Sequence, residues 1–79
     1  MILIVFDEIA REAGCYERVQ PIAVNPLSIE RVTPAEVPGF DDACCEIQIA
    51  TEDSPRFIAG SFASAMKALS DWEEANSDG

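Results

Sequence analysis

Residues 45–50 have the sequence Cys-Glu-Ile-Gln-Ile-Ala, the most regular alternation of apolar and polar side chains in the chain. On an extended strand, Cys45, Ile47 and Ile49 share one face, and Glu46 and Gln48 share the other. This period of two predicts a β-strand with one buried and one solvated face. The next residues, Glu-Asp-Ser-Pro at 52–55, are typical of a turn, so residues 56–59 are expected to return as the partner strand.

A helix is predicted directly after this strand pair. Gly60 and Ser61 open it, with Ser61 as the N-cap. Apolar residues then recur at helical spacing, which predicts an amphipathic helix over residues 61–74. We expect Met66 and Trp72 to belong to the core and the last residues, 75–79, to fray. The apolar stripe consists of Phe62, Ala65, Met66, Leu69 and Trp72.

The start of the chain allows two interpretations. Residues 2–6 form a β-rich run, which predicts a short buried strand. Residues 7–13 are more helical in composition, and Gly14 is a helix stop signal. The alternative is a single helix over residues 2–13 with an apolar face. We favour the strand. The face of the alternative helix would consist of Ile2, Val5, Phe6, Ile9 and Ala13.

The next segment is predicted to be extended and then to turn. Residues 16–24 alternate imperfectly, and Pro21 confines them to an edge strand or to the end of a strand. Asn25 and Pro26 predict a cap followed by a short helical turn. We expect the apolar residues that follow, Leu27 and Ile29, to anchor this turn to the core.

Residues 29–32 are expected to be extended again, and residues 33–43 to form an exposed loop. The loop assignment rests on two prolines, a glycine and the pair Asp41-Asp42. Long loops of this kind often carry binding contacts.

Together these elements predict an α+β fold: a small antiparallel sheet of three to five strands, with the C-terminal helix packed on one face. Seventy-nine residues suffice for one core, so we expect a single domain over residues 1–79. The apolar start lacks the basic region of a signal peptide, and it is far shorter than the roughly 20 residues of a membrane span. We therefore expect a cytoplasmic protein.

The charge of the chain restricts its partners. Fifteen Asp and Glu residues face five Lys and Arg residues, and the formal net charge is −10. Nucleic acids and anionic membranes would repel such a surface, whereas a basic protein surface complements it. We expect no direct binding to nucleic acid or membrane.

The residues that usually perform catalysis or bind cofactors are scarce. The chain contains no histidine, and its four glycines are scattered singly, so no phosphate-binding loop is predicted. Three thiols without a fourth ligand make a poor zinc site. Adjacent Cys44 and Cys45 would point to opposite faces of a strand, and we expect free thiols in or near the core. We predict a non-enzymatic protein that needs no cofactor or metal.

Acidic residues cluster at several places, and these clusters are the candidate partner-binding sites. Carboxylates in the last turn of a helix oppose its dipole and lower its stability. Their presence here indicates either that function requires them or that solvent screening makes their position harmless. Paired carboxylates about 6 Å apart, as on adjacent turns of a helix, resemble the spacing of nucleic-acid phosphates and could imitate them. The candidates are Asp7, Glu8 and Glu12; Asp41 and Asp42; Glu52 and Asp53; and Asp71, Glu73 and Glu74.

In length, acidity, lack of catalytic residues and α+β pattern, the chain resembles the small anti-CRISPR proteins of bacteriophages. It is most similar to those directed at multi-subunit type I effectors, type I-C among them. The resemblance implies an inhibitor that occupies the basic groove where an effector subunit holds target DNA. A second, local resemblance, over residues 23–29 and the later strand pair and helix, is to small bacterial β-meander proteins, and it concerns the fold.

Two functions remain open at this point. One is an inhibitor that engages a nucleic-acid-binding protein complex through acidic patches and blocks binding of target DNA; its affinity would fall steeply with salt. The other is a structural or regulatory adaptor that docks through an apolar patch, as a monomer or as a homodimer, with affinity insensitive to salt. The oligomeric state, the identity of the partner and the acidic cluster that makes contact are not determined by the sequence.

Overall fold

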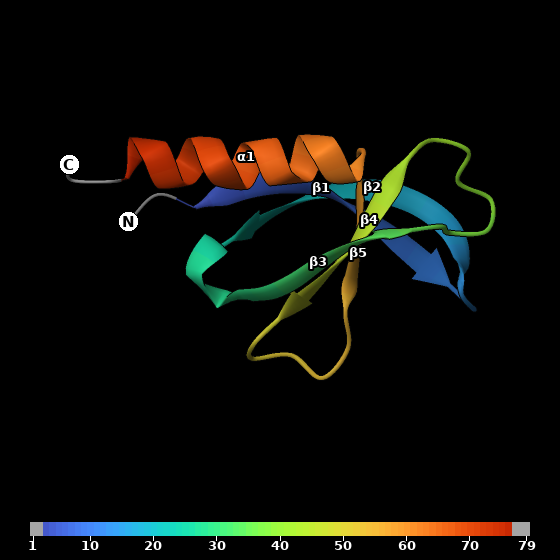
Figure 1. The fold of residues 1–79 in the computed structure, drawn as a ribbon. Coiled ribbons are helices and arrows are strands. Elements are labelled where there is room, and N and C mark those ends of the chain that lie inside the picture. The colour runs from blue at the N-terminus through green and yellow to red at the C-terminus, as the bar shows by residue number, and fades with distance from the viewer. Residues whose placement is uncertain (1–2, 77–79) are drawn as a thin grey trace.

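The computed structural model describes residues 3–76, which form five strands, one short 3₁₀ helix and one α-helix (Figure 1). The helix lies along one side of the strands, and both ends of the described chain lie at the same end of the molecule. The elements, in chain order, are β1 (Ile4–Glu12), β2 (Cys15–Val24), η1 (Pro26–Ser28), β3 (Ile29–Ala35), β4 (Cys44–Ile49), β5 (Arg56–Ala59) and α1 (Phe62–Ala75).

The strands form one antiparallel sheet in the order β2-β1-β5-β4-β3. The α-helix contacts β3, β4 and β1. The predicted α+β fold, with an antiparallel sheet and a C-terminal helix on it, is therefore confirmed. Strand β2 lies at one edge of the sheet, as Pro21 predicted, and β3 lies at the other.

The first two strands form a long hairpin, so both helical interpretations of residues 7–13 are wrong. Strand β1 continues to Glu12 and pairs along its whole length with β2. Its turn is Ala13-Gly14, with φ angles of 53° and 84°. Positive φ at both positions is the type I′ geometry that matches the twist of a two-residue hairpin. Pairing on two sides outweighs the helical composition of residues 7–13, and Gly14 ends a turn instead of a helix.

The larger core lies between the sheet and the helix. It is built on Ile47 and Ile58, both essentially inaccessible to solvent, with Ala65 as the buried contact of the helix. The alternation predicted for residues 45–50 is confirmed, because Cys45, Ile47 and Ile49 all face this core. The remaining buried members of this core are Phe6 and Val24, with Ile4, Ile22, Ile29, Val32 and Ala68 packed around them.

A second, smaller core lies under residues 36–43, the connection between β3 and β4. Val37 is buried there with Ile9 and Cys44. The connection is tied to the hairpin by a hydrogen bond from the Tyr16 amide to the Pro38 carbonyl (2.8 Å). The ring of Phe40 also contacts the ring of Tyr16, with 5.3 Å between centroids. The predicted loop is thus shorter than 33–43 and is held in place by the second core and by Tyr16.

Residues 33–35 belong to β3, which corrects the predicted start of the loop. Pro34 lies opposite Cys45 in the ladder. A proline is tolerated there because β3 is an edge strand, where a missing amide donor can face the unpaired side.

The turn after β2 forms as predicted, but its contact with the core is only partly as predicted. The Asn25 side chain accepts a hydrogen bond from the Leu27 amide (3.0 Å), and Pro26 is the first residue of η1. Ile29 packs on the larger core. Leu27 is 71 % exposed, so its assignment as an anchor is wrong.

The helix begins as predicted, but its apolar stripe is only partly buried. The Ser61 hydroxyl accepts a hydrogen bond from the Ser64 amide (3.1 Å), which is the expected N-cap. Phe62 and Met66 remain 40 % and 42 % exposed, so Met66 is not a core residue. The only fully buried helical residue in the described part of the chain is Ala65. Trp72 is half-buried.

The thiols follow the prediction in part. Cys44 and Cys45 are buried in different cores, so they lie on opposite faces of β4. Burial raises the pKa of the Cys45 thiol. Cys15, at the start of β2, is exposed. All three cysteines are free.

The turn of the hairpin gives a direct test of the fold. Ala13 occupies a left-handed conformation. Asparagine adopts this conformation more readily than alanine does, whereas valine adopts it far less readily. We expect Ala13→Asn to raise the free energy of unfolding by about 0.5–1 kcal/mol and Ala13→Val to lower it by about 1 kcal/mol. Urea unfolding monitored by Trp72 fluorescence measures both. Equal stabilities for the two variants would contradict the type I′ turn.

Candidate functional site

The ten predicted site residues do not form a single patch. The C-terminal turns of α1, the 36–43 connection and the turn between β4 and β5 lie at three separate places on the molecule (Figure 1). The acidic residues of β1 are divided between a buried and an exposed environment. Each acidic cluster therefore has its own surroundings.

Two of the predicted residues, Glu8 and Glu52, are bound within the chain by Arg56. Its Nη1 donates to Glu8 Oε2 at 2.6 Å, and its Nε donates to Glu52 Oε1 at 2.8 Å. The second oxygen of Glu8 accepts a hydrogen bond from Gln20 Nε2 at 2.9 Å. The Glu8 side chain is only 12 % exposed. Both carboxylates therefore serve the fold, because they neutralise an arginine that joins β1, β5 and the β4–β5 turn.

This network shifts the ionisation of its members. Hydrogen bonds from Arg56 lower the pKa of the Glu52 carboxyl, and hydrogen bonds to Glu52 and Glu8 raise the pKa of Arg56. A buried carboxylate is stable only when it is paired in this way. Sequence reasoning missed the pairing of Glu8, because Arg56 is 48 residues away in the chain.

The other two residues of the first cluster, Asp7 and Glu12, are exposed on β1. The expected spacing of about 6 Å between Glu8 and Glu12 required a helix. On a strand, residues four apart are separated by about 13 Å, from a rise of about 3.3 Å per residue. The first cluster therefore does not imitate a phosphate track.

The acidic end of the helix is exposed. Asp71 is paired with Lys67, with 2.8 Å between Oδ2 and Nζ, and this hydrogen bond raises the pKa of Lys67. Glu73 and Glu74 are exposed and have no cationic partner among residues 3–76. The Asn76 side chain caps this end by donating to the Trp72 carbonyl (2.8 Å). The carboxylates of Glu73 and Glu74 therefore oppose the helix dipole without a compensating cation in the described residues.

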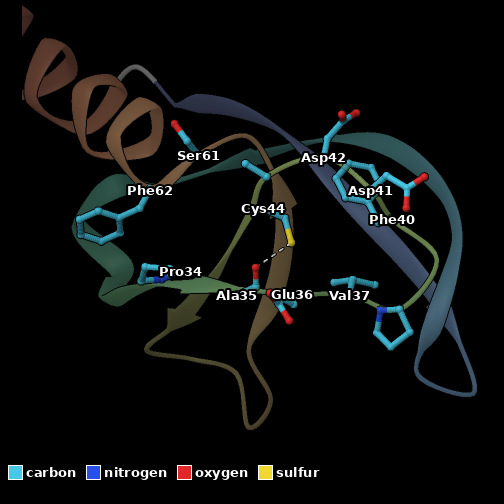
Figure 2. A pocket seen from close by; sticks show the side chains of 12 residues that line it. Pro34, Ala35, Glu36, Val37, Phe40, Asp41, Asp42, Cys44, Ser61 and Phe62 are labelled. Atoms are coloured by element: carbon cyan, nitrogen blue, oxygen red, sulfur yellow. Dashed lines mark hydrogen bonds between the residues drawn. The ribbon is translucent and has the colours of Figure 1, made fainter.

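The third location is a hollow of about 700 Å³ between the 36–43 connection, the end of β3 and the start of α1. Its inner wall is apolar, and Cys44 closes it by donating a hydrogen bond from Sγ to the Ala35 carbonyl (3.2 Å). Figure 2 shows the carboxylates of Asp41 and Asp42 directed outward from the rim, with Phe62 at the far side. Glu36 adds a third carboxylate to this rim.

Sequence reasoning did not include Glu36 in the site. Its position in the same predicted loop as Asp41 and Asp42 was the available signal. The apolar part of the wall was not predictable, because Val37 is buried, and Phe40 partly buried, by contacts with distant strands.

The predicted cluster of Glu52 and Asp53 retains one carboxylate without an ion pair in the described residues. Asp53, in the β4–β5 turn, is exposed, whereas its neighbour Glu52 is held by Arg56. The two residues line a shallow hollow beside Arg11 and Arg56. Cations at this place make it a poor site for a basic partner.

Most of the negative charge is not neutralised within the described chain. Four carboxylates take part in ion pairs: Glu8, Glu17, Glu52 and Asp71. Ten others in residues 3–76 have no cationic partner: Asp7, Glu12, Glu30, Glu36, Asp41, Asp42, Glu46, Asp53, Glu73 and Glu74.

No group of three or more metal-ligating side chains occurs in the described part of the chain. Within the same residues, no helix combines the length and hydropathy that crossing a bilayer needs. Comparison with protein-family models, with curated proteins and with solved structures gave no match.

The Arg56 network predicts a pH-dependent contribution to stability. Because the folded-state pKa of Glu52 lies below its ordinary value of 4.5, the ionised carboxylate stabilises the fold above that pH. This contribution is lost as the pH falls through the lowered pKa. We expect Glu52→Gln to be less stable than the parent at pH 7, and we expect the difference to shrink as the pH falls below 4.5, as measured by urea unfolding.

Arg56→Met should be more damaging than Glu52→Gln, since it leaves Glu8 largely buried and unpaired. We expect a loss of about 1–3 kcal/mol at pH 7, less than for a fully buried pair because Arg56 is partly exposed. Arg18→Met is the matched control, because the Arg18–Glu17 pair is exposed. A change of less than about 0.5 kcal/mol is expected there. Equal losses in the two variants would refute the structural role of Arg56.

Proposed function

We propose that this chain is a non-enzymatic inhibitor that binds the basic surface of a nucleic-acid-binding protein complex. The observation that carries the proposal is the set of ten carboxylates without a cationic partner. A sequence selected for stability alone gains nothing from so much uncompensated charge, because self-repulsion destabilises the compact state. A cationic surface relieves that repulsion on binding, and it accelerates association by electrostatic steering.

The hollow beside the 36–43 connection is the best candidate for the contact. Carboxylates alone give a diffuse attraction, whereas an apolar wall adjacent to them supplies buried contact area and shape. Here Asp41, Asp42 and Glu36 border a hollow of about 700 Å³ that apolar side chains also line. The tie between Tyr16 and Pro38 holds the connection in position, which lowers the entropic cost of binding.

For the partner, we propose a CRISPR–Cas effector of type I, with type I-C as the first to test. Its DNA-binding groove must be cationic, because it holds a polyanion. An acidic protein in this groove would exclude target DNA by competition. The site of action is then the bacterial cytoplasm, with a bacteriophage as the source of the chain.

A second candidate function is an adaptor that docks through an apolar surface. It is favoured by the exposure of large apolar side chains on the helix and in η1. Its binding would be insensitive to salt, and that property separates it from the inhibitor.

Charge reversal tests the inhibitor and its site together. The assay is fluorescence polarisation of labelled target duplex bound to a purified type I-C effector complex, with the full chain as competitor. We expect Asp41→Lys/Asp42→Lys to weaken inhibition by at least tenfold, and added salt to weaken the parent steeply.

The matched control is Glu73→Lys/Glu74→Lys, which changes the net charge equally at the far end of the helix. We expect this variant to inhibit within about threefold of the parent, because screening makes distant exposed charges weak. Equal loss in both double variants would contradict the assignment to the 36–43 connection. Absence of inhibition by the parent chain would refute the proposed target.

A further inference from the structure

Strand β3 ends the sheet without a partner on its outer side in the described structure. The strand order is β2-β1-β5-β4-β3, so one edge of β3 (Ile29–Ala35) pairs with β4 and the other edge is open. An open edge presents a row of backbone donors and acceptors to any extended segment that fits beside it. Seven residues are long enough to form a ladder with another chain.

The helix extends its apolar flank over this open edge. Phe62, Met66 and Leu69 lie at positions i, i+4 and i+7, which places them on one face of the helix. They line a groove of about 260 Å³ together with Ile29 and Val32 of β3. The groove lies where the side chains of a further strand would pack. Phe62 and Met66 of the predicted apolar stripe are thus partly exposed because the sheet ends at β3, and no further strand packs against this side of the helix in the described structure.

The groove and the hollow described above are neighbours. Phe62 borders both, and β3 residues line each of them. Carboxylates dominate this surface: Glu30 lines the groove, and the rim of the hollow adds Glu36, Asp41 and Asp42. Arg31 is the one cation that lines either cavity in the described chain.

We propose that an extended segment of a cationic partner protein binds beside β3 and adds a sixth strand to the sheet. Its backbone would pair with the open edge. Apolar side chains on one face of the segment would fill the groove under Phe62 and Met66. Lysine or arginine side chains would contact Glu30 and the carboxylates of the hollow. This is the strand-addition mode of peptide recognition, in which the ladder supplies affinity and the side-chain pockets supply specificity.

The other open edge is a poorer acceptor. Both edge strands contain one proline, Pro21 in β2 and Pro34 in β3, but most side chains of β2 are exposed. Its exposed residues include the ion pair between Glu17 and Arg18. At the start of β2, the Tyr16 amide already donates to the Pro38 carbonyl of the 36–43 connection. The apolar flank of α1 lies near β3, because the contacts of α1 with the sheet are chiefly to β3, β1 and β4.

A second copy of this chain is also a poorer occupant than a cationic segment. It would bring another ten negative charges to an acidic surface. Its own β3 carries one arginine for four neighbouring carboxylates, so it offers little to neutralise them. The sign of the charge therefore selects a basic partner.

The inference deepens the proposed function, from which it takes the cationic nature of the partner, but strand addition can be tested without any effector complex. The probe is a synthetic seven-residue peptide of alternating lysine and valine, added to the full-length ¹⁵N-labelled chain. We expect amide chemical-shift changes in β3, the 36–43 connection and the first turns of α1, with little change in β2. Hydrogen exchange of β3 amides should slow.

Two control peptides and two double variants make the test specific. A peptide of alternating glutamate and valine should bind at least tenfold more weakly, because its charge is wrong. The lysine–valine peptide with N-methylated valines should also lose at least tenfold, since it lacks ladder donors. Phe62→Gln/Met66→Gln should weaken binding at least tenfold, whereas Val5→Gln/Val19→Gln, also at exposed positions, should change it less than twofold. Circular dichroism establishes that each variant is folded.

Several results would overturn the inference. They are no binding of the lysine–valine peptide, undiminished binding of the N-methylated peptide, shifts confined to β2 or to the end of α1, or a dimer of the chain whose β3 amides are already protected. Failure of effector inhibition with retained peptide binding at β3 would remove the proposed target and leave the strand-addition site intact. Inhibition of the effector without peptide binding at β3 would remove the strand-addition site and leave the proposed target intact.

Discussion

The double ion pair of Arg56 with Glu8 and Glu52 sets the charge balance of the whole molecule. The fold buries Glu8 on the face of β1 that meets the core, and an unpaired carboxylate there would be costly. Arg56 meets this demand and at the same time closes the β4–β5 turn. Arg56 is thus committed to two carboxylates, and three other cations are held by Glu17, Asp71 and the ring of Phe57, so little unpaired positive charge remains. With fifteen acidic and five basic residues, most surface carboxylates are left without a cationic partner in the described chain.

The end of the sheet at β3 is the second constraint. The helix covers the core with Ala65 and Ala68, which are small and allow close approach to the strands. Its larger apolar residues, Phe62 and Met66, lie toward the side where the sheet stops. Acidic exterior and open edge meet at the same place, beside β3 and the 36–43 connection. The proposed inhibitor and the proposed strand addition therefore describe one surface, on which charge attracts the partner and the ladder and groove hold it.

Local signals predicted the C-terminal half of the fold well. The alternation at 45–50, the turn before Arg56 and the N-cap at Ser61 each depend on a few neighbouring residues. The β1–β2 hairpin was missed because its turn has alanine where asparagine or aspartate is usual, so Gly14 was the one local signal for positive φ and it was interpreted as a helix stop. The strand order could not be predicted from the sequence either. The exposure of Met66 depends on where the sheet ends, so it could not be predicted. Among the acidic residues, sequence reasoning found Asp41 and Asp42 but had no means to detect that Glu8 pairs with a residue 48 positions away.

The central claim is that a cationic protein is recognised along β3 and the 36–43 connection. Hydrogen exchange of the full chain, alone and mixed with a type I-C effector complex, tests it most directly, because it reports which backbone segments a partner covers. The account predicts that exchange slows over residues 29–43 and that the protection fades as salt is raised. Protection confined to β2 or to the last turns of α1, or no protection at any salt concentration, would contradict it.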